Sequence, residues 1–294
     1  MEFTKDYFKH KYLEYFARFY SDRKFLEMYF PMKMGYKLNL DNPKSMNEKL
    51  NWIKINDRKP QYIRMVDKVE AKKYIEELLG TDKYTIPTLG VYNTVDEIDI
   101  NKLPDKFVLK CTHDSGGIVI CEGKDNFDWD KGRKILTCGL KKNYYWLNRE
   151  WPYKLIKPRI IAEEYKVDES GWQLKDYKVF CFNGEPKFVE VDYDRYVGHK
   201  LNVYDLDWNY IDFYMTSHND PNVKIGKPER LEEMLELAKK LSVGTIFLRV
   251  DFYSIYSKLY VGELTLTPGS GMIGFHPKEY DWKLGEMLKL PFEK

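Results

Sequence analysis

The chain has 294 residues, of which 43% are hydrophobic and 32% are charged, with a formal net charge of +2. This length and apolar fraction suit a globular protein of two or three lobes with a sizeable core. The near-balance of charges gives no case for nucleic-acid binding, and no window approaches the roughly 18 apolar residues that a membrane-spanning helix needs. The four cysteines form no C-x-x-C pair and are expected to be reduced, buried thiols.

The N-terminal part of the chain is predicted to be helical. Residues 5–30 mix aromatic and charged residues at helix-compatible spacing, without the apolar region of a signal peptide. We therefore expect a cytoplasmic protein, with peripheral association of this basic, aromatic segment with the inner face of the membrane as an alternative. Ser45 with Glu48, and Asp67 with Glu70, form capping patterns that predict two helix starts.

Beyond residue 86 short β runs predominate, with helices predicted between them. Alternating apolar residues between turn signals predict strands, and an Asn-Gly pair between two such runs predicts a hairpin. In chain order the predicted elements are a strand at 107–111, a turn at 113–117, a strand at 118–121, a helix at 131–148, a strand at 159–162, a hairpin at 176–194, a helix that opens at Pro228, and strands at 247–253 and 259–266.

The most informative segment runs from Arg249 to Thr265. Side chains alternate along a strand, so Arg249 and Asp251 share one face of the first strand, and Glu263 and Thr265 share one face of the next. If these strands pair, two carboxylates, a hydroxyl and a guanidinium stand on one surface. Mg²⁺ takes a few carboxylate ligands and completes its shell with water and phosphate, and arginine suits phosphate oxygens. The alternative is the exposed face of a half-buried sheet.

Lysines near a glycine turn form a second candidate site. Lys110 lies in an apolar strand just before the turn that contains Gly116 and Gly117, and glycines let backbone N–H groups approach a phosphate. An ordinary hairpin turn explains the same residues. Lys68 lies at a helix start, where anions are favoured over cations, so it either accompanies a bound phosphate or is simply solvated. The chain contains no Walker A pattern.

Charged residues also gather at a strand end and on the predicted hairpin. Glu163 and Glu164 end a strand, where they can meet an adenine and a ribose, or form an ordinary charged strand end. Lys178 and Arg195 lie on the hairpin arms, where they can reach a phosphate and an anionic substrate.

Two shorter patterns carry less weight. Asp192 and Asp194 form a D-x-D, which is typical of nucleotide-sugar glycosyltransferases and also of a solvated hairpin face. Ser270 lies in a P-G-S-G loop, where no neighbouring base marks it as a nucleophile, so a structural or substrate-loop role is favoured. The five histidines show no H-x-x-x-H pair, so a zinc site of that type is not indicated.

Taken in order along the chain, these features resemble the ATP-grasp superfamily, and more narrowly the TupA-like ATP-grasp proteins of bacterial surface-polysaccharide clusters. A lysine at a helix start, a lysine before a glycine turn, acids at a strand end, and R-x-D and E-x-T before P-G-S-G follow one another over roughly residues 37 to 286. The segments that carry the resemblance are Pro43–Trp52, Asp67-Lys68, Ile86-Pro87, Leu89–Tyr92, Leu103-Pro104, Phe107–Lys110, Asp176–Lys178, Phe182–Gly184, Arg249–Tyr253, Gly262–Thr265 and Pro268–Gly271.

The resemblance implies an α+β ATP-grasp fold with a helical N-terminal region at 1–66, a small lobe at 67–162 and a large lobe at 163–294, the two lobes clasping the nucleotide. It implies ATP and Mg²⁺ (or Mn²⁺) as cofactors. Family members commonly carry Asn where this chain has Thr265. The implied roles are ATP binding by Lys68, Lys110, Ser115, Gly116, Gly117, Glu163, Glu164, Val167 and Lys178; catalysis by Arg249 and Lys110; metal binding by Asp251, Glu263 and Thr265; and substrate binding by Arg195, Gly269, Ser270 and Gly271.

The implied chemistry is activation of a carboxylate by ATP as an acyl phosphate, which an amine then attacks to form an amide. By analogy with the family, the carboxylate is a hexuronic acid of a surface polysaccharide or its precursor, and the amine is an amino acid or amino alcohol. Catalysis of this kind is mainly positioning and charge neutralisation. The alternatives are a polysaccharide-biosynthesis glycosyltransferase that uses Asp192 and Asp194, and a catalytically silent nucleotide-binding protein.

Overall fold

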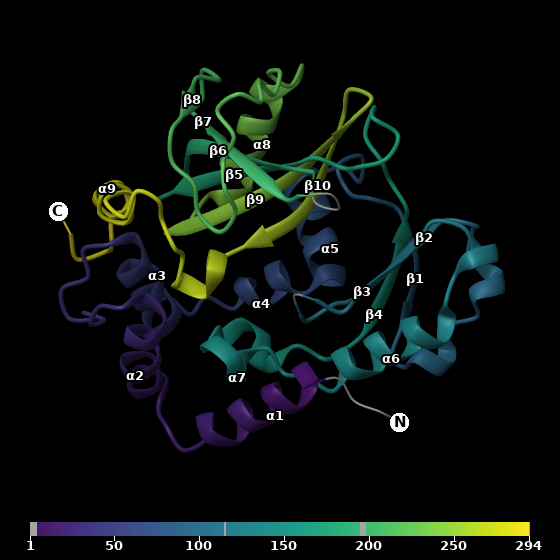
Figure 1. Ribbon diagram of the computed structural model, residues 1–294, viewed down its shortest axis with the longest axis horizontal. Helices are drawn as coiled ribbons and strands as arrows, with labels where there is room; N and C mark the ends of the chain where they lie inside the picture. Colours follow the sequence, from purple (N-terminus) through teal and green to yellow (C-terminus); the bar gives the residue numbers. More distant parts are fainter. Residues whose placement is uncertain (1–4, 115, 195–197, 294) are drawn as a thin grey trace. The chain divides into compact units, whose positions relative to one another are not determined.

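The computed structural model describes residues 5–114, 116–194 and 198–293 (Figure 1). Ser115 and Arg195, which are predicted above to bind ATP and substrate, lie outside these described residues. The chain forms two compact units, the first from residues 1–25, 58–74 and 86–166 and the second from residues 26–57, 75–85 and 167–294. The lobe boundaries expected at residues 67 and 163 stay predictions.

The first unit is built around a four-stranded antiparallel sheet with the order β1-β4-β2-β3. Alternation along β2 turns Phe107, Leu109 and Cys111 towards α6, where they form a core with Leu136, and leaves Lys110 on the opposite face. The expected strands at 107–111 and 118–121 are confirmed. The strands are β1 (Thr88–Tyr92), β2 (Phe107–Cys111), β3 (Ile118–Cys121) and β4 (Ile160–Glu164).

The single helix predicted over residues 131–148 is wrong, because the structure has two helices there. The first ends before Lys141, and the Asn143 side chain accepts a hydrogen bond from the Tyr145 backbone N–H at 3.2 Å, which favours a new helix start over continuation of the old one. These two helices are α6 (Trp129–Leu140) and α7 (Tyr145–Asn148). The other helices of the first unit, or shared with the second, are α1 (Lys5–Ala17), α2 (Asp22–Met34), α4 (Gln61–Val66) and α5 (Lys68–Leu79).

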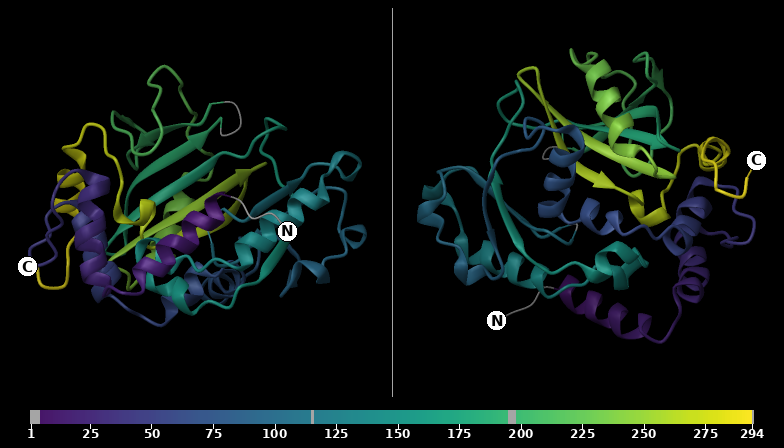
Figure 2. Two further views of the ribbon diagram at one scale, coloured as in Figure 1. Left: turned by 60° about the horizontal axis from the view of Figure 1, so that its bottom comes forward. Right: turned by 180° about the vertical axis from the view of Figure 1, so that it is seen from behind.

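The second unit contains a six-stranded antiparallel sheet with the order β10-β9-β5-β6-β7-β8. One face is covered by α8, whose buried stripe includes Leu231, Met234 and Leu241 (Figure 2, right). The predicted hairpin is confirmed, with Asn183 and Gly184 both at positive φ, as a tight primed turn requires. The strands are β5 (Asp176–Phe182), β6 (Glu185–Tyr193), β7 (Lys200–Tyr204), β8 (Tyr210–Ile211), β9 (Phe247–Ile255) and β10 (Lys258–Thr265).

The other face of this sheet changes character along the strands. At one end Phe180, Phe188 and Phe247 pack with α3 and α9 in an aromatic core. Because side chains on one face recur every second residue, the same face continues from Phe180 to Lys178 and from Phe247 to Arg249. The apolar end therefore fixes the register of a charged end on the same surface. The remaining helices are α3 (Met46–Asn56), α8 (Leu231–Ser242) and α9 (Tyr280–Met287).

Both predicted helix starts are confirmed. Ser45 and Glu48 form a complete capping box at α3, and the Asp67 carboxylate accepts hydrogen bonds from the backbone N–H groups of Val69 and Glu70 in α5 at 2.9 and 3.2 Å. The four cysteines are buried free thiols, as expected. Among the helices that the structure describes, none has the length and apolar character to cross a membrane.

Candidate functional site

In the first unit, Lys72, Lys110 and Glu163 form an ion-paired group that we call the lysine–glutamate trio. The Glu163 carboxylate lies 2.6 Å from Lys110 Nζ through one oxygen and pairs with Lys72 through the other. Burial raises the pKa of Glu163, but the two ammonium groups outweigh this effect and bring it to about 2. Two lysines thus share one carboxylate, and the surplus positive charge suits a phosphate oxygen.

The glycine turn lies against Lys68 in the same unit. The Lys68 ammonium donates to the Asp114 backbone carbonyl at 2.6 Å, and the Gly117 N–H donates to the Asp114 carboxylate at 3.2 Å. A Cβ at Gly117 would lie 2.8 Å from Cys111 Sγ, so the tight closure of this turn requires glycine. The structure therefore brings Lys68 to the turn, and Gly116 in it is exposed.

The predicted adenine and ribose residues have different surroundings. Glu163 is buried, with each of its oxygens in an ion pair. Glu164 is half-buried and lies 2.6 Å from Lys166 Nζ, and Val167 is the first residue of the second unit. Their part in nucleotide binding stays a prediction. The ion pairs of Glu163 with two lysines favour that role least, because both of its oxygens are already engaged.

In the second unit, strand register alone assembles the charged end of the sheet. In the antiparallel pair of β9 and β10, Asp251 lies opposite Glu263 and Arg249 lies opposite Thr265, so the pairing on which the sequence argument depended is confirmed. On the other side of β9, Asp251 lies opposite Lys178 of β5. Directly opposed residues on one face are close enough to interact, which makes these five side chains neighbours.

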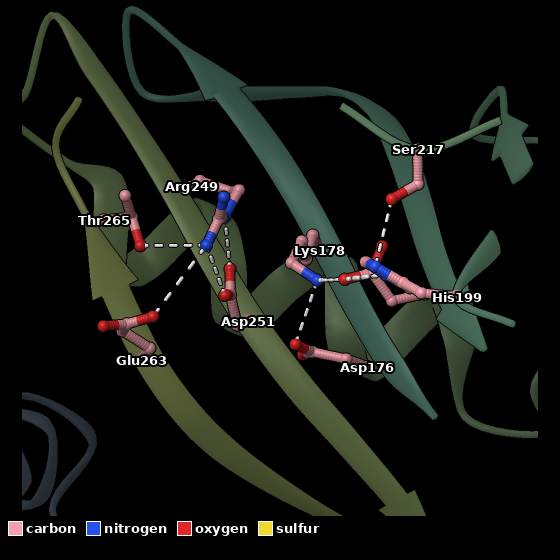
Figure 3. A network of polar contacts seen from close by, with 9 residues as sticks. Asp176, Lys178, His199, Ser217, Arg249, Asp251, Glu263 and Thr265 are labelled. Carbon is pink, nitrogen blue, oxygen red and sulfur yellow. Dashed lines mark hydrogen bonds and ion pairs between the residues drawn. The ribbon is translucent and has the colours of Figure 1, made fainter. Parts of the chain in front are cut away.

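Arg249 is the central donor of this surface (Figure 3). Its guanidinium donates to both oxygens of Asp251 at 2.6 Å each and to Thr265 Oγ1 at 3.1 Å, and it lies 3.9 Å from the Glu263 carboxylate. A β-bulge precedes Glu263 at Gly262, where a Cβ would lie 2.6 Å from the Tyr253 ring. The two hydrogen bonds to Asp251 hold the Arg249 guanidinium in a bidentate contact, whereas the Glu263 side chain is 43% exposed.

Lys178 organises the adjoining part of the same face. Its ammonium lies 3.0 Å from the Asp176 carboxylate (Figure 3) and also pairs with Asp192. Glu190 is its cross-strand neighbour on β6. We call the whole group the acid cluster. Its members are the carboxylates Asp176, Glu190, Asp192, Asp251 and Glu263 with the cations Lys178 and Arg249.

The acid cluster carries more carboxylates than cations, and its burial makes that excess costly. Burial, together with the negative charge of Asp192, raises the pKa of Glu190 to about 7. Burial also raises the pKa of Asp251 to about 7 against the opposing effect of Arg249. A group of this kind gains from any further positive charge, and a divalent cation supplies two.

The donor chemistry of the acid cluster fits Mg²⁺. Among the described residues, no group of three or more His, Cys, Asp or Glu side chains has the arrangement of a complete metal site. Mg²⁺ does not need one, because it is commonly held by one or two carboxylates plus phosphate and water. Asp251 and Glu263 are opposed carboxylates of this kind, and Asp251 can accept further bonds beside those from Arg249.

A chain of polar contacts extends the acid cluster at its β7 end. His199 Nε2 lies 3.3 Å from Asp192 Oδ2, and Ser217 Oγ lies 3.0 Å from His199 Nδ1 (Figure 3). Asp192 of the D-x-D is thus bound to Lys178 and His199, whereas Asp194 lies beyond the strand at positive φ.

The P-G-S-G segment forms a short turn rather than an open loop. Gly269, Ser270 and Gly271 all have φ between 54° and 67°, and α3 side chains hold their carbonyl groups: Lys54 donates to Ser270 O at 2.8 Å and Asn51 to Gly271 O at 2.7 Å. The turn is thereby fixed in place within the second unit, and its predicted contact with substrate stays a prediction.

Sequence reasoning missed Lys72, Glu190 and His199. Lys72 follows Lys68 by one helical turn, and Glu190 precedes Asp192 by one strand repeat, so periodicity could have indicated both. His199 had no such signal, because its contact with Asp192 depends on the pairing of β6 with β7.

Comparison with known proteins identifies the family of the chain. The sequence matches the family described as TupA-like ATPgrasp over residues 48–289, and the chain belongs to that family. The predicted family and the α+β ATP-grasp class are confirmed. No curated protein matches the sequence.

Several solved ATP-grasp ligases overlap the structure in part. D-alanine–D-alanine ligase from Bacillus anthracis, complexed with ATP, is 15% identical with a TM-score of 0.41, over 69% of this chain and 54% of that one. The Helicobacter pylori enzyme is 15% identical with a TM-score of 0.41, over 84% and 68%. The ligase PsnB, complexed with a precursor variant, Mg and ADP, is 10% identical with a TM-score of 0.43, over 82% and 64%. The chain spans about half the length of the B. anthracis ligase. Because these similarities are limited, they assign no roles to individual residues.

Proposed function

We propose that this protein is an ATP-dependent carboxylate–amine ligase. The carboxylate, a hexuronic acid of a surface polysaccharide or its precursor, attacks the γ-phosphorus of ATP and releases ADP. The nitrogen of a small amine then attacks the acyl carbon, the phosphate leaves with the bridging oxygen, and the nitrogen loses a proton. Because the reaction consumes ATP, we place the protein in the cytoplasm.

One observation carries the proposal: two groups of mostly buried side chains have opposite charge excess. The lysine–glutamate trio has more cations than carboxylates, and the acid cluster has more carboxylates than cations. Phosphate oxygens would supply the negative charge that suits the trio in the first unit, and a divalent ion would supply the positive charge that suits the acid cluster in the second. Membership of the TupA-like ATP-grasp family supports the same chemistry.

Each group has a distinct part in the proposed reaction. Lys68, Lys72 and Lys110 would contact phosphate oxygens with point charges, and the Gly116 and Gly117 backbone would lie close to them. Asp251 and Glu263 would hold Mg²⁺, which when bound withdraws charge from the phosphate oxygens. Arg249 would stabilise the charge that develops on the transferring phosphoryl group.

The first experiment is a thermal-shift comparison of ATP with Mg²⁺ against UDP-sugars with Mn²⁺. A ligand at 100 times its Kd stabilises a fold by roughly 2.7 kcal/mol, which is easily measured. We expect stabilisation by ATP and Mg²⁺. Stabilisation by UDP-sugars alone would overturn the proposal in favour of a glycosyltransferase.

The second experiment tests the reaction itself. Hexuronic acids are incubated with ATP, Mg²⁺ and hydroxylamine, which traps an acyl phosphate as a hydroxamate, and then with amino acids or amino alcohols in its place. We expect ADP, phosphate and a product whose mass equals acid plus amine minus water. ATP binding without ADP formation across all the uronate and amine pairs would indicate a catalytically silent nucleotide-binding protein.

A further inference from the structure

The first helix has its faces reversed relative to an ordinary surface helix. His10, Glu14 and Ala17, at helical spacing on one face of α1, are 3%, 7% and 0% exposed. The aromatic residues Phe8, Tyr12, Tyr15 and Phe19 on and just beyond the other face are 60–69% exposed. A helix on a globular protein normally buries its apolar stripe and exposes its polar one, and contiguous exposed apolar patches mark interaction sites.

Buried polar contacts hold this reversed orientation in place. Helix α1 lies alongside α7 (Figure 1), and the guanidinium of Arg149, which is 1% exposed, donates to the backbone carbonyls of Ala17 and Tyr20. Arg149 also stacks on the rings of Phe25 and Tyr145. Because a buried guanidinium that lost these acceptors would be destabilising, α1 cannot simply rotate to bury its aromatic side.

The exposed charges around the aromatic stripe have one sign. Among the described side chains of residues 7–25, the exposed charged ones are Arg18, Arg23 and Lys24. The acids of this stretch are turned inwards, where Glu14 pairs with Lys11 and Arg18 and Asp22 pairs with Arg58. With four cations against two acids, the described side chains of residues 7–25 keep a net positive charge. A partner of this surface must therefore accept both aromatic rings and positive charge.

We propose that the exposed aromatic face of α1 (Phe8, Tyr12, Tyr15, Phe16 and Phe19) binds the surface of an anionic lipid bilayer. Aromatic side chains favour the headgroup region of a membrane, and lysine and arginine beside them are attracted to anionic lipids. At 13 residues, α1 is about 20 Å long, which suits a helix that lies in the plane of the interface. This inference goes beyond the proposed reaction and is independent of it.

The test is co-sedimentation of the full chain with vesicles of phosphatidylcholine alone and of phosphatidylcholine with 30% phosphatidylglycerol. We expect binding to the anionic vesicles that is at least tenfold stronger than to the neutral ones and that weakens in 0.5 M salt. A chain that stays in the supernatant with anionic vesicles would overturn the proposal.

Matched variants separate this face from general stickiness. Y15S/F19S removes two exposed rings of the aromatic face, and W172S/Y256S removes two exposed rings from the second unit. We expect the first variant to lose at least tenfold in vesicle binding and the second to bind as the parent does, both with unchanged thermal unfolding. Equal binding by the parent and Y15S/F19S would refute the assignment.

Two further measurements address the charges and the competing occupant. R23Q/K24Q should lower binding to anionic vesicles by roughly fivefold for each charge and leave binding to neutral vesicles unchanged. Light scattering should give the parent and Y15S/F19S the same molecular mass, which would exclude self-association through this face. A dimer that disappears in that variant would mean that the face binds a second copy of the chain, and the membrane proposal would fall.

Discussion

The lysine–glutamate trio and the acid cluster solve the same problem, buried charge, with opposite results. In the trio one carboxylate is shared by two lysines, and the pKa of Glu163 falls to about 2. In the acid cluster the cations are outnumbered, and the pKa values of Glu190 and Asp251 rise to about 7. The comparison teaches that the two groups, as defined by their members, have opposite charge excess, with more cations than carboxylates in one and more carboxylates than cations in the other.

Removal of a carboxylate from the acid cluster should have the largest effect, a loss of activity that distinguishes this group from the trio. Asp251→Asn and Glu263→Gln each delete a ligand of the proposed metal site, so we expect the rate of ADP formation with Mg²⁺ to fall by roughly 10²–10³-fold. The matched control is Glu236→Gln, an exposed acid on α8 of the same unit, which should be neutral. Full activity in both site variants, with thermal unfolding as the check on folding, would show that the metal lies elsewhere.

Removal of a lysine from the trio should act on ATP affinity. Lys110→Met deletes one of two cations beside Glu163, and we expect the Kd for ATP with Mg²⁺ to rise about tenfold or more, as the loss of a buried charge-assisted contact predicts. Lys72→Met should behave in the same way, although sequence patterns did not single it out. Titration calorimetry measures both.

Lys102→Met, which changes an exposed lysine of the same unit, is the control for the trio variants and should bind ATP normally. If the two trio variants also bind ATP as the parent does, the surplus positive charge of the trio serves only the stability of the first unit.

The pH dependence of stability should differ between the two groups. An acid with a raised pKa binds its proton more tightly in the folded state, so Asp251 and Glu190 make the fold more stable as pH falls from about 8 towards 5. Glu163, whose pKa is lowered, contributes stability above about pH 4.5 that is lost only as pH falls towards 2. Urea midpoints between pH 5.5 and 8.5 should therefore report the acid cluster.

Asp251→Asn should make the urea midpoint depend less on pH. Mg²⁺ with ATP should also reduce the gain in stability at low pH, because a bound cation favours the ionised carboxylates. A parent profile that is flat or that rises with pH over this window would contradict the charge excess of the cluster.

Only those contacts of the acid cluster that follow from the alternation of side chains along a strand could be predicted from the sequence. Arg249 with Asp251, and Glu263 with Thr265, follow from a two-residue period, and the structure pairs them as expected. The contacts of Lys178 with Asp192, and of Asp192 with His199, depend on how β5, β6 and β7 are ordered, which periodicity does not specify.

In the first unit the same limit applies to the trio. Capping chemistry located the start of α5, and apolar alternation located β2, so Lys68 and Lys110 were each placed on the right element. That Lys72 and Lys110 meet at one carboxylate is a consequence of tertiary packing, and Glu163 consequently appeared in the sequence as a strand-end acid rather than as their shared partner.

The smallest expected effect concerns Thr265, where the chain departs from the usual family pattern. Thr265 presents a neutral hydroxyl that accepts a hydrogen bond from Arg249 at 3.1 Å. An asparagine there would offer a carbonyl oxygen, a better ligand for a hard cation than a hydroxyl engaged by arginine. We expect Thr265→Asn to lower the Mg²⁺ concentration for half-maximal ADP formation by a few-fold, and Thr265→Val, which keeps the shape and deletes the oxygen, to leave it unchanged or raise it. Magnesium titrations at saturating ATP distinguish the two, and identical curves for all three proteins would show that position 265 has no part in metal binding and serves only to orient Arg249.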